Sequence, residues 1–201
     1  MKLCKLLMIA SAALTFTTSA LAQPDYVRVK DITYNGSGCP VGSADLYFQD
    51  GNFQSFFMQL DDYYAEAGEG ISLRDSRKNC QLSFKLEFPQ GWTYAIGSMT
   101  YSGFAHLERN VVAKQQASYY FTGEAEQATI RTEFEGPMHR NFWLTDSAQA
   151  LIYAPCKSEA ILNVNSSVQV RSLNRHNYGA IGLDNLRGSL VSFNFNWKRC
   201  S

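Results

Sequence analysis

The chain has 201 residues, of which 45% are hydrophobic, and its 18 Lys and Arg balance 18 Asp and Glu. A formal net charge of zero, without a run of like charges, argues against nucleic acid or an anionic membrane as a partner. Beyond residue 22, no stretch approaches the roughly 18 consecutive apolar residues of a spanning helix, so we expect no membrane span.

Residues 1–22 have the pattern of a secretory signal peptide. Lys2 and Lys5 give a positive start, an apolar run follows, and small residues precede Gln23. A glutamine rather than a cysteine after the cleavage site argues against a bacterial lipoprotein. We therefore expect a secreted chain, extracellular or periplasmic, with a single domain over residues 23–201 that is long enough to bury a core.

Four cysteines remain when the leader is removed: Cys39, Cys80, Cys156 and Cys200. An even number in an exported chain predicts two disulfides, with three possible pairings. We favour Cys39–Cys80 and Cys156–Cys200, because these pairs close two loops of similar length, one in each half of the chain. No C-x-x-C is present, which argues against a thioredoxin-type or zinc site.

The glycines next to the first cysteine predict a turn. We expect Gly36-Ser37-Gly38 to follow a sharp path that aims Cys39 at its partner, with Pro40 fixing the exit. An anion-binding nest is the alternative. A phosphate loop, however, needs a longer glycine pattern with Lys and Ser or Thr, which is absent here.

Apolar and polar residues alternate along much of the chain. The clearest segments are 82–88, 128–134, 162–170 and 191–197. Successive side chains of an extended chain point to opposite faces, so each segment has one buried and one solvated face. This pattern is typical of antiparallel strands that cover a single core.

Turn signals separate the predicted strands. Asp50-Gly51-Asn52 lies between two aromatic-rich runs and predicts a hairpin tip. Residues 104–117 also fit helical spacing, but we interpret them as a hairpin around Arg109-Asn110. Many short strands with frequent turns predict an all-β, antiparallel β-sandwich; the sequence leaves open whether its topology is jelly-roll or immunoglobulin-like.

Several short motifs resemble one protein family. They are Gly36–Pro40, RKNCQLSFKLEFPQGW at 77–92, YYFTG followed by FEGP, APC followed by LNVNSSVQV, and the closing Trp197 and Cys200. In this order they resemble the small secreted proteins of domain-of-unknown-function family 4360 (DUF4360), over nearly all of residues 23–201. The resemblance implies export and an all-β domain, and it agrees with the favoured disulfide pairing. It implies no activity, cofactor or catalytic residue.

Aromatic residues are the main candidates for a binding surface. The chain has 3 Trp, 11 Tyr and 13 Phe, and exposed rings stack on sugars or pack at protein interfaces. The rings too dense to face one core are Phe53, Phe56, Phe57, Tyr63 and Tyr64, with Trp92, Tyr94 and Tyr101 beyond them. The polar stretch 171–188 is predicted as a long, functional loop. We predict Trp92, Tyr94, His176 and Tyr178 as ligand-binding residues.

Metal-binding patterns are weak. The three histidines, His106, His139 and His176, lie far apart without metal-ligand spacing. The acidic stretch from Asp61 to Glu69 offers oxygen ligands for calcium but lacks the spacing of an EF-hand. We predict no metal and no cofactor.

Catalytic patterns are equally weak. No G-x-S-x-G nucleophile elbow is present. Glu133 and Glu135 have the separation of a glycosidase carboxyl pair, but any two residues at this spacing on a strand share it. We predict no catalytic residue and therefore no enzyme.

The sequence thus favours a secreted, noncatalytic binding or surface-associated protein, with a carbohydrate or a cell-surface protein as its partner. One alternative is a carbohydrate-active hydrolase that uses a carboxylate pair, and another is a secreted inhibitor with a disulfide-braced loop. Asn35-Gly36-Ser37 and Asn165-Ser166-Ser167 fit the N-glycosylation pattern, which matters only in a host that glycosylates such sites.

Overall fold

The computed structural model describes residues 23–48, 55–156, 159–183 and 189–200. The predicted signal peptide and the predicted tip Asp50-Gly51-Asn52 lie outside these ranges. All regular structure within them is β-strand: β1 (Arg28–Asn35), β2 (Ala44–Phe48), β3 (Ser55–Leu60), β4 (Tyr64–Ala67), β5 (Arg77–Glu87), β6 (Trp92–Leu107), β7 (Val111–Phe121), β8 (Gln127–Glu135), β9 (Met138–Ser147), β10 (Glu159–Ser172), β11 (Gly179–Gly182) and β12 (Ser189–Arg199). Among these residues no helix is long and apolar enough to cross a membrane.

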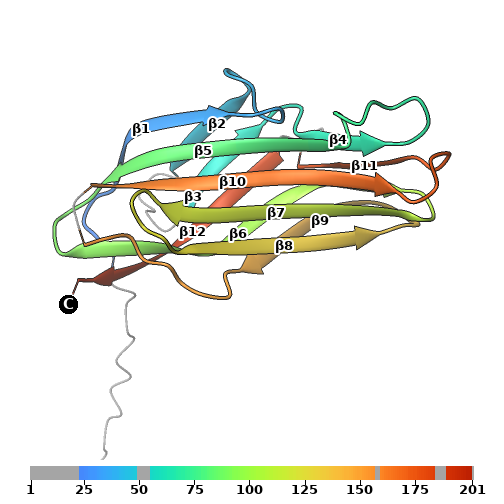
Figure 1. The fold of residues 1–201 in the computed structure, drawn as a ribbon. Coiled ribbons are helices and arrows are strands. Elements are labelled where there is room, and N and C mark those ends of the chain that lie inside the picture. Colours follow the sequence, from blue (N-terminus) through green and yellow to red (C-terminus); the bar gives the residue numbers. More distant parts are fainter. Residues whose placement is uncertain (1–22, 49–54, 157–158, 184–188, 201) are drawn as a thin grey trace, which may run out of the picture.

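The strands form two sheets that pack face to face (Figure 1). The five-stranded sheet has the order β1-β5-β10-β7-β8. The seven-stranded sheet has the order β2-β3-β12-β6-β11-β4, and β9 also pairs with β6. Every ladder is antiparallel. The predicted all-β antiparallel sandwich is confirmed.

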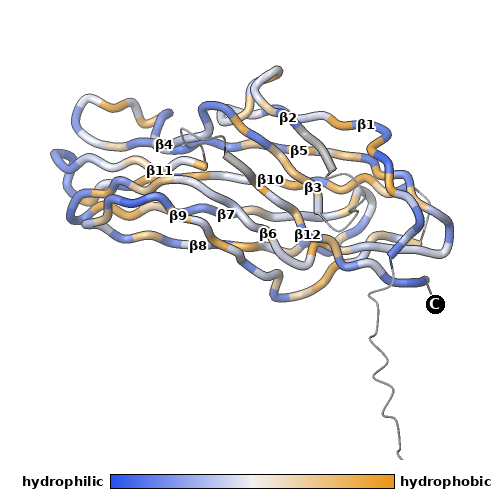
Figure 2. The backbone as a smooth tube through the Cα atoms, turned by 180° about the vertical axis from the view of Figure 1, so that it is seen from behind, coloured by the Kyte–Doolittle hydropathy of each residue, from blue (hydrophilic) through white to orange (hydrophobic). Residues whose placement is uncertain are grey.

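The core is built from the inward faces that the alternation predicts, and hydropathy alternates along the strands in Figure 2. On β5 the buried residues are Cys80, Leu82, Phe84 and Leu86, and Phe88 is buried directly after the strand; on β10 they include Leu162, Val164, Val168 and Val170. Tyr94 lies at the centre of an aromatic cluster. Its ring centroid is 5.1 to 5.5 Å from those of Phe88, Phe121, Phe195 and Trp197.

Both predicted disulfides are confirmed. Cys39 bonds to Cys80 with a Cα–Cα distance of 5.3 Å, and Cys156 bonds to Cys200 with 5.9 Å. Each bond fixes a segment that connects the two sheets. Cys80 lies on β5 and Cys39 in the turn that enters β2, whereas Cys200 follows β12 and Cys156 precedes β10.

The glycines at 36 and 38 are explained by close approach of neighbouring atoms. A Cβ atom on Gly36 would lie 2.0 Å from the carbonyl oxygen of Asn79, and one on Gly38 would lie 2.1 Å from the ring of Tyr63. Neither glycine has a left-handed φ. The predicted turn exists, but the need is for space rather than for unusual backbone angles.

The predicted hairpin at 104–117 is corrected by the topology. A turn does lie at Arg109-Asn110, and Asn110 has a φ of 62°. The strands on either side, β6 and β7, belong to different sheets, so this turn is an arch between the layers. Leu107 and Val111 are both buried, because the two strands face one another across the core instead of pairing edge to edge.

The predicted long loop at 171–188 is also corrected. The strand β10 continues to Ser172, and β11 occupies Gly179–Gly182 between β4 and β6. Within the described residues, the loop is reduced to the segment 173–178 between β10 and β11. Small and apolar residues at 179–182 allow this short strand to fit between its two neighbours, and all four are buried.

Candidate functional site

Two of the four predicted ligand-binding residues lie inside the protein. Trp92 is 3% exposed and Tyr94 is 0% exposed, so the prediction that they form an exposed surface is wrong. Both side chains lie at the start of β6, where the core is lined by rings. The count of aromatic residues suggested a surplus, but a two-sheet core accommodates most of them, including Phe56, Tyr63 and Tyr101.

The other two predicted residues lie at the surface, in the loop before β11. The backbone N–H of Tyr178 donates to Glu108 Oε2 at 2.8 Å, and its hydroxyl donates to Glu66 Oε2 at 3.0 Å. Burial is the main cause of the raised pKa of Tyr178, and the hydrogen bond to Glu66 raises it further. His176 Nδ1 lies 2.9 Å from Glu69 Oε2. These contacts use two carboxylates of the acidic stretch considered for calcium.

Tyr178 belongs to a surface that the sequence did not reveal. It covers the outer face of the seven-stranded sheet where β6 lies between β9 on one side and β11 and β4 on the other. We call it the aromatic–histidine surface, and it consists of Tyr64, Phe104, His106, His139, Trp143 and Tyr178.

The register of the strands brings these side chains together. His106 on β6 lies directly opposite His139 on β9, and the next outward residue of β6, Phe104, lies opposite Asn141. Trp143 follows on β9, because alternate residues of a strand share a face. On the other side of β6, Gly182 of β11 separates Phe104 from Tyr64 of β4.

The surface combines exposed rings with small residues. Trp143 is 63% exposed, and Tyr64 is 39% exposed. The ring of Phe104 lies against Gly182, where an added Cβ would meet it at 2.5 Å. The rings of His106 and His139 lie edge to face with centroids 4.2 Å apart, and those of His106 and Tyr178 are 5.9 Å apart.

A hollow of about 300 Å³ adjoins this surface at the edge of β4. Tyr64 belongs to both, and Glu66, Asp62, Asp75 and Lys78 line the polar wall of the hollow. Lys78 Nζ bonds to Asp75 Oδ1 at 2.7 Å. The surface therefore offers apolar rings on the sheet and hydrogen-bonding groups at its border.

Strand β9, which carries Trp143, is fixed from beneath. Asp146 points inward and accepts hydrogen bonds from the hydroxyls of Tyr101 and Thr132. Tyr101 belongs to β6 and Thr132 to β8, so this carboxylate links both sheets at their β8–β9 edge. Burial raises the pKa of Tyr101, which therefore remains a donor.

Trp143 could have been found from alternation. Phe142 is buried and Leu144 packs against the core, so the residue between them points to solvent. Because residues 138–147 are not among the predicted strands, this signal is missed. The pairing of His106 with His139 was not accessible, because it depends on the register of two strands separated by β7 and β8.

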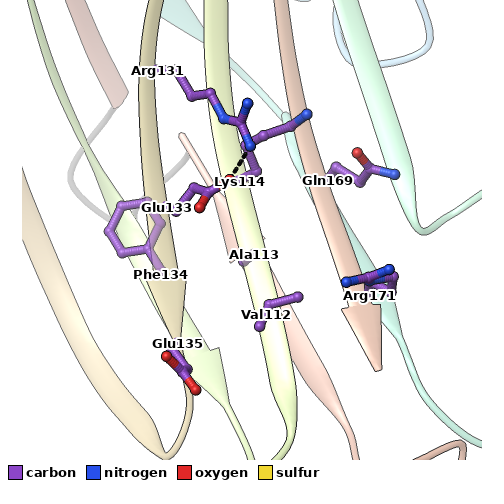
Figure 3. A pocket seen from close by; sticks show the side chains of 9 residues that line it. All are labelled: Val112, Ala113, Lys114, Arg131, Glu133, Phe134, Glu135, Gln169 and Arg171. Atoms are coloured by element: carbon purple, nitrogen blue, oxygen red, sulfur yellow. Dashed lines mark hydrogen bonds and ion pairs between the residues drawn. The ribbon is translucent and has the colours of Figure 1, made fainter. Parts of the chain in front are cut away.

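The predicted carboxylate pair lies on the opposite side of the molecule. Glu133 and Glu135 line a hollow of about 490 Å³ on the five-stranded sheet (Figure 3). Arg131 forms an ion pair with Glu133, and Lys114 and Arg171 line the same hollow. Both carboxylates are exposed. A glycosidase acid needs a protonated carboxyl in a setting that disfavours its charge, so this cation-rich, open hollow disfavours the hydrolase alternative.

Known proteins place the chain in a family. An uncharacterized secreted protein of Arthroderma benhamiae is 33% identical over 181 residues, which cover 89% of this chain and 74% of that protein. A solved structure of TmCBM61 in complex with β-1,4-galactotriose covers 85% of this chain and 90% of its own, with 12% identity. Its TM-score of 0.27 is too low to carry an argument. The model of a domain of unknown function, DUF4360, matches residues 25–200, and the chain belongs to this family.

Proposed function

We propose that the protein is a secreted, noncatalytic binding protein whose aromatic–histidine surface holds a neutral glycan chain. The observation that carries this proposal is Trp143, a large ring left 63% exposed on the sheet, with Phe104 outward on the neighbouring strand β6 and Tyr64 outward two strands further on. Sugars present apolar faces and hydroxyl edges. Rings can stack on the faces, while Asn141 and the imidazoles bond to the hydroxyls.

The layout fits an extended ligand. From Tyr64 on β4 to Trp143 on β9 the surface crosses β11 and β6, which at the usual strand spacing is a span of about 14 Å. The backbone of a sheet holds the rings in place before a ligand arrives, so little ordering entropy is lost on binding. The outward positions between the rings carry Ala180, Gly182 and Asn141, none of them charged, which suits a neutral chain.

Two observations support the location. The relative from Arthroderma benhamiae is described as a secreted protein, and the two disulfides are of the kind that persists in oxidising compartments. We extend the proposal to a mature chain that begins at Gln23 and forms a single domain. The choice between extracellular and periplasmic, and the secreted-inhibitor alternative, stay predictions.

A polysaccharide-binding assay on the mature protein tests the proposal. We expect Trp143→Ala to weaken binding about tenfold or more, because a large ring stacked on a ligand contributes on the order of 1–2 kcal/mol. Gln116→Ala is the matched control, since Gln116 lies on the outward register of β7, on the other face of the sandwich, and we expect it to bind as the wild type does.

Three results would overturn the proposal. Glycan binding that survives Trp143→Ala but is lost in Gln116→Ala would place the site on the five-stranded sheet instead. Capture of a cell-surface protein with no glycan bound would favour the protein partner. Glycan turnover that disappears in Glu133→Gln or Glu135→Gln would show a hydrolase.

A further inference from the structure

We propose that His106 and His139 form a two-histidine site for a divalent transition metal ion, with Cu²⁺ preferred. The two residues lie directly opposite one another on the antiparallel strands β6 and β9. Both are exposed, and their ring centroids are 4.2 Å apart. The metal site does not rest on the proposed glycan function, although both imidazoles belong to the aromatic–histidine surface.

The backbone already supplies the geometry that chelation needs. Directly opposed residues of antiparallel strands have Cβ atoms about 4.5–5.5 Å apart, on the same face of the sheet. Two nitrogens bound to one ion at about 2.0–2.1 Å each lie about 3 Å from one another, which is within reach of such a pair. Rotation of the exposed rings from their edge-to-face packing is sufficient, and the strands need not move.

The surroundings favour a cation. Glu108 and Glu66 both bond to Tyr178, whose ring packs against His106, so two carboxylates lie on this side of the pair. The neighbouring outward positions on the three strands are Phe104, Asn141 and Ala180, which carry no charge. The small side chain of Ala180 leaves the approach from β11 open.

Imidazole determines which ion fits. It is a good ligand for copper, nickel and zinc, and the affinity of a nitrogen site for divalent ions is highest for Cu²⁺. Within the described residues no group of three or more His, Cys, Asp and Glu is placed to hold a metal. The protein therefore contributes two nitrogens, and water fills the remaining positions. Such a site has no preference for calcium or magnesium, which take oxygen ligands.

Calorimetric titration of the tag-free mature protein with CuCl₂, ZnCl₂ or CaCl₂ tests the site. We expect one Cu²⁺ per chain, weaker binding of Zn²⁺ and none of Ca²⁺. His106→Gln and His139→Gln should each lower the Cu²⁺ affinity about tenfold or more, since loss of even an outer partner of a metal ligand has an effect of this size. His176→Gln is the matched control, because it removes the third histidine of the chain from a different contact.

Thermal unfolding separates loss of the site from loss of the fold. Cu²⁺ should raise the Tm of the wild type and of His176→Gln, but not that of the double variant His106→Gln/His139→Gln, which should otherwise unfold like the wild type. Absence of Cu²⁺ binding, binding that persists in the double variant, or equal loss in His176→Gln would overturn the proposal. Trp143→Ala should retain the ion, so failure of the metal site and failure of glycan binding are distinguishable.

Discussion

The two outer faces of the sandwich differ in how many large rings they present to solvent. On the five-stranded sheet, Asn163 accepts a hydrogen bond from Ser83 Oγ at 2.6 Å and donates one to Thr122 Oγ1 at 2.8 Å. Ser118 and Thr129 pair at 2.9 Å on the same face. The seven-stranded sheet instead presents Trp143 and its neighbouring rings to solvent. Polar side chains pair on both faces, since Thr100 and Thr145 also bond at 2.8 Å on the seven-stranded sheet. The seven-stranded face differs in that it also gathers several large rings at the surface.

Both faces rest on one frame, which the two disulfides brace. Removal of a disulfide should therefore have the largest effect on stability. We expect Cys39→Ala/Cys80→Ala to lower the free energy of unfolding by about 4 kcal/mol, from the loop of 41 residues that it opens. Cys156→Ala/Cys200→Ala opens a loop of 44 residues and is the matched variant. Urea unfolding without reductant measures both.

The first double variant should lose more stability than the second. The two loops have nearly equal closure entropy, but Cys39 and Cys80 are 0% and 1% exposed, so their removal also leaves a cavity in the core. Cys156 is exposed and Cys200 is half-buried. Equal losses would show that the buried bond contributes no packing.

A direct contrast between the faces comes from one residue on each. Asn163→Ala removes two hydrogen bonds from a side chain that is 7% exposed, and we expect a loss of about 1–2 kcal/mol in the free energy of unfolding. Trp143→Ala should change it by less than about 0.5 kcal/mol, because the ring is mostly in water. Urea titrations measure stability in both variants, and glycan binding is measured in parallel. Asn163→Ala should lower stability and keep binding, whereas Trp143→Ala should keep stability and weaken binding. A large destabilisation by Trp143→Ala would show that this ring serves the fold.

Much of this architecture could be predicted from sequence, because alternation reports local physics. The buried faces of β5 and β10 follow from residues at every second position, and the disulfides follow from the count and spacing of cysteines. The site could not be predicted in the same way. Opposition of His106 and His139 depends on strand register, which no local pattern encodes.

Two of the three wrong predictions have related causes. Trp92 and Tyr94 were assigned to the surface because the chain has many rings, but composition does not tell which rings a core accepts. The turn at Arg109-Asn110 was assigned to a hairpin because two strands flank it. A turn signal locates a reversal of the chain, yet whether the second strand pairs or crosses to the other sheet depends on partners far away in sequence.

The layer between the faces gives a finer test, with two buried tyrosines. The hydroxyl of Tyr63 donates to Ser166 Oγ of β10 at 3.0 Å, which links the sheets. The hydroxyl of Tyr94 is buried without a hydrogen-bond partner among the described residues. We expect Tyr63→Phe to lower the free energy of unfolding by about 1 kcal/mol and Tyr94→Phe to leave it unchanged or raise it by about 1 kcal/mol. Equal losses in urea unfolding would reveal a partner for Tyr94.

The smallest effect belongs to the charged end of the five-stranded face. Glu159 bonds to Lys30 Nζ at 2.7 Å and to Lys85 Nζ at 2.6 Å, and these two bonds lower its pKa from 4.5 to about 2. Because the folded state holds the carboxylate more strongly than the unfolded state does, the stabilisation is complete above pH 4.5 and disappears as the pH falls towards 2. Glu159→Gln should therefore be less stable than the wild type at neutral pH, and the gap should close on acidification.

The gap should be small, since all three side chains are substantially exposed to solvent, and it should shrink further in high salt. Urea unfolding of wild type and Glu159→Gln at pH 7, 3.5 and 2, with and without added salt, measures it. Gln81→Glu is a useful contrast, because it adds a carboxylate to the middle of the same face. The cross-strand neighbours of residue 81, Asn165 and Asn35, are uncharged. A gap that persists at pH 2 would mean that Glu159 stabilises the strand ends by packing. In that case the ion pairs would not distinguish this face from the other.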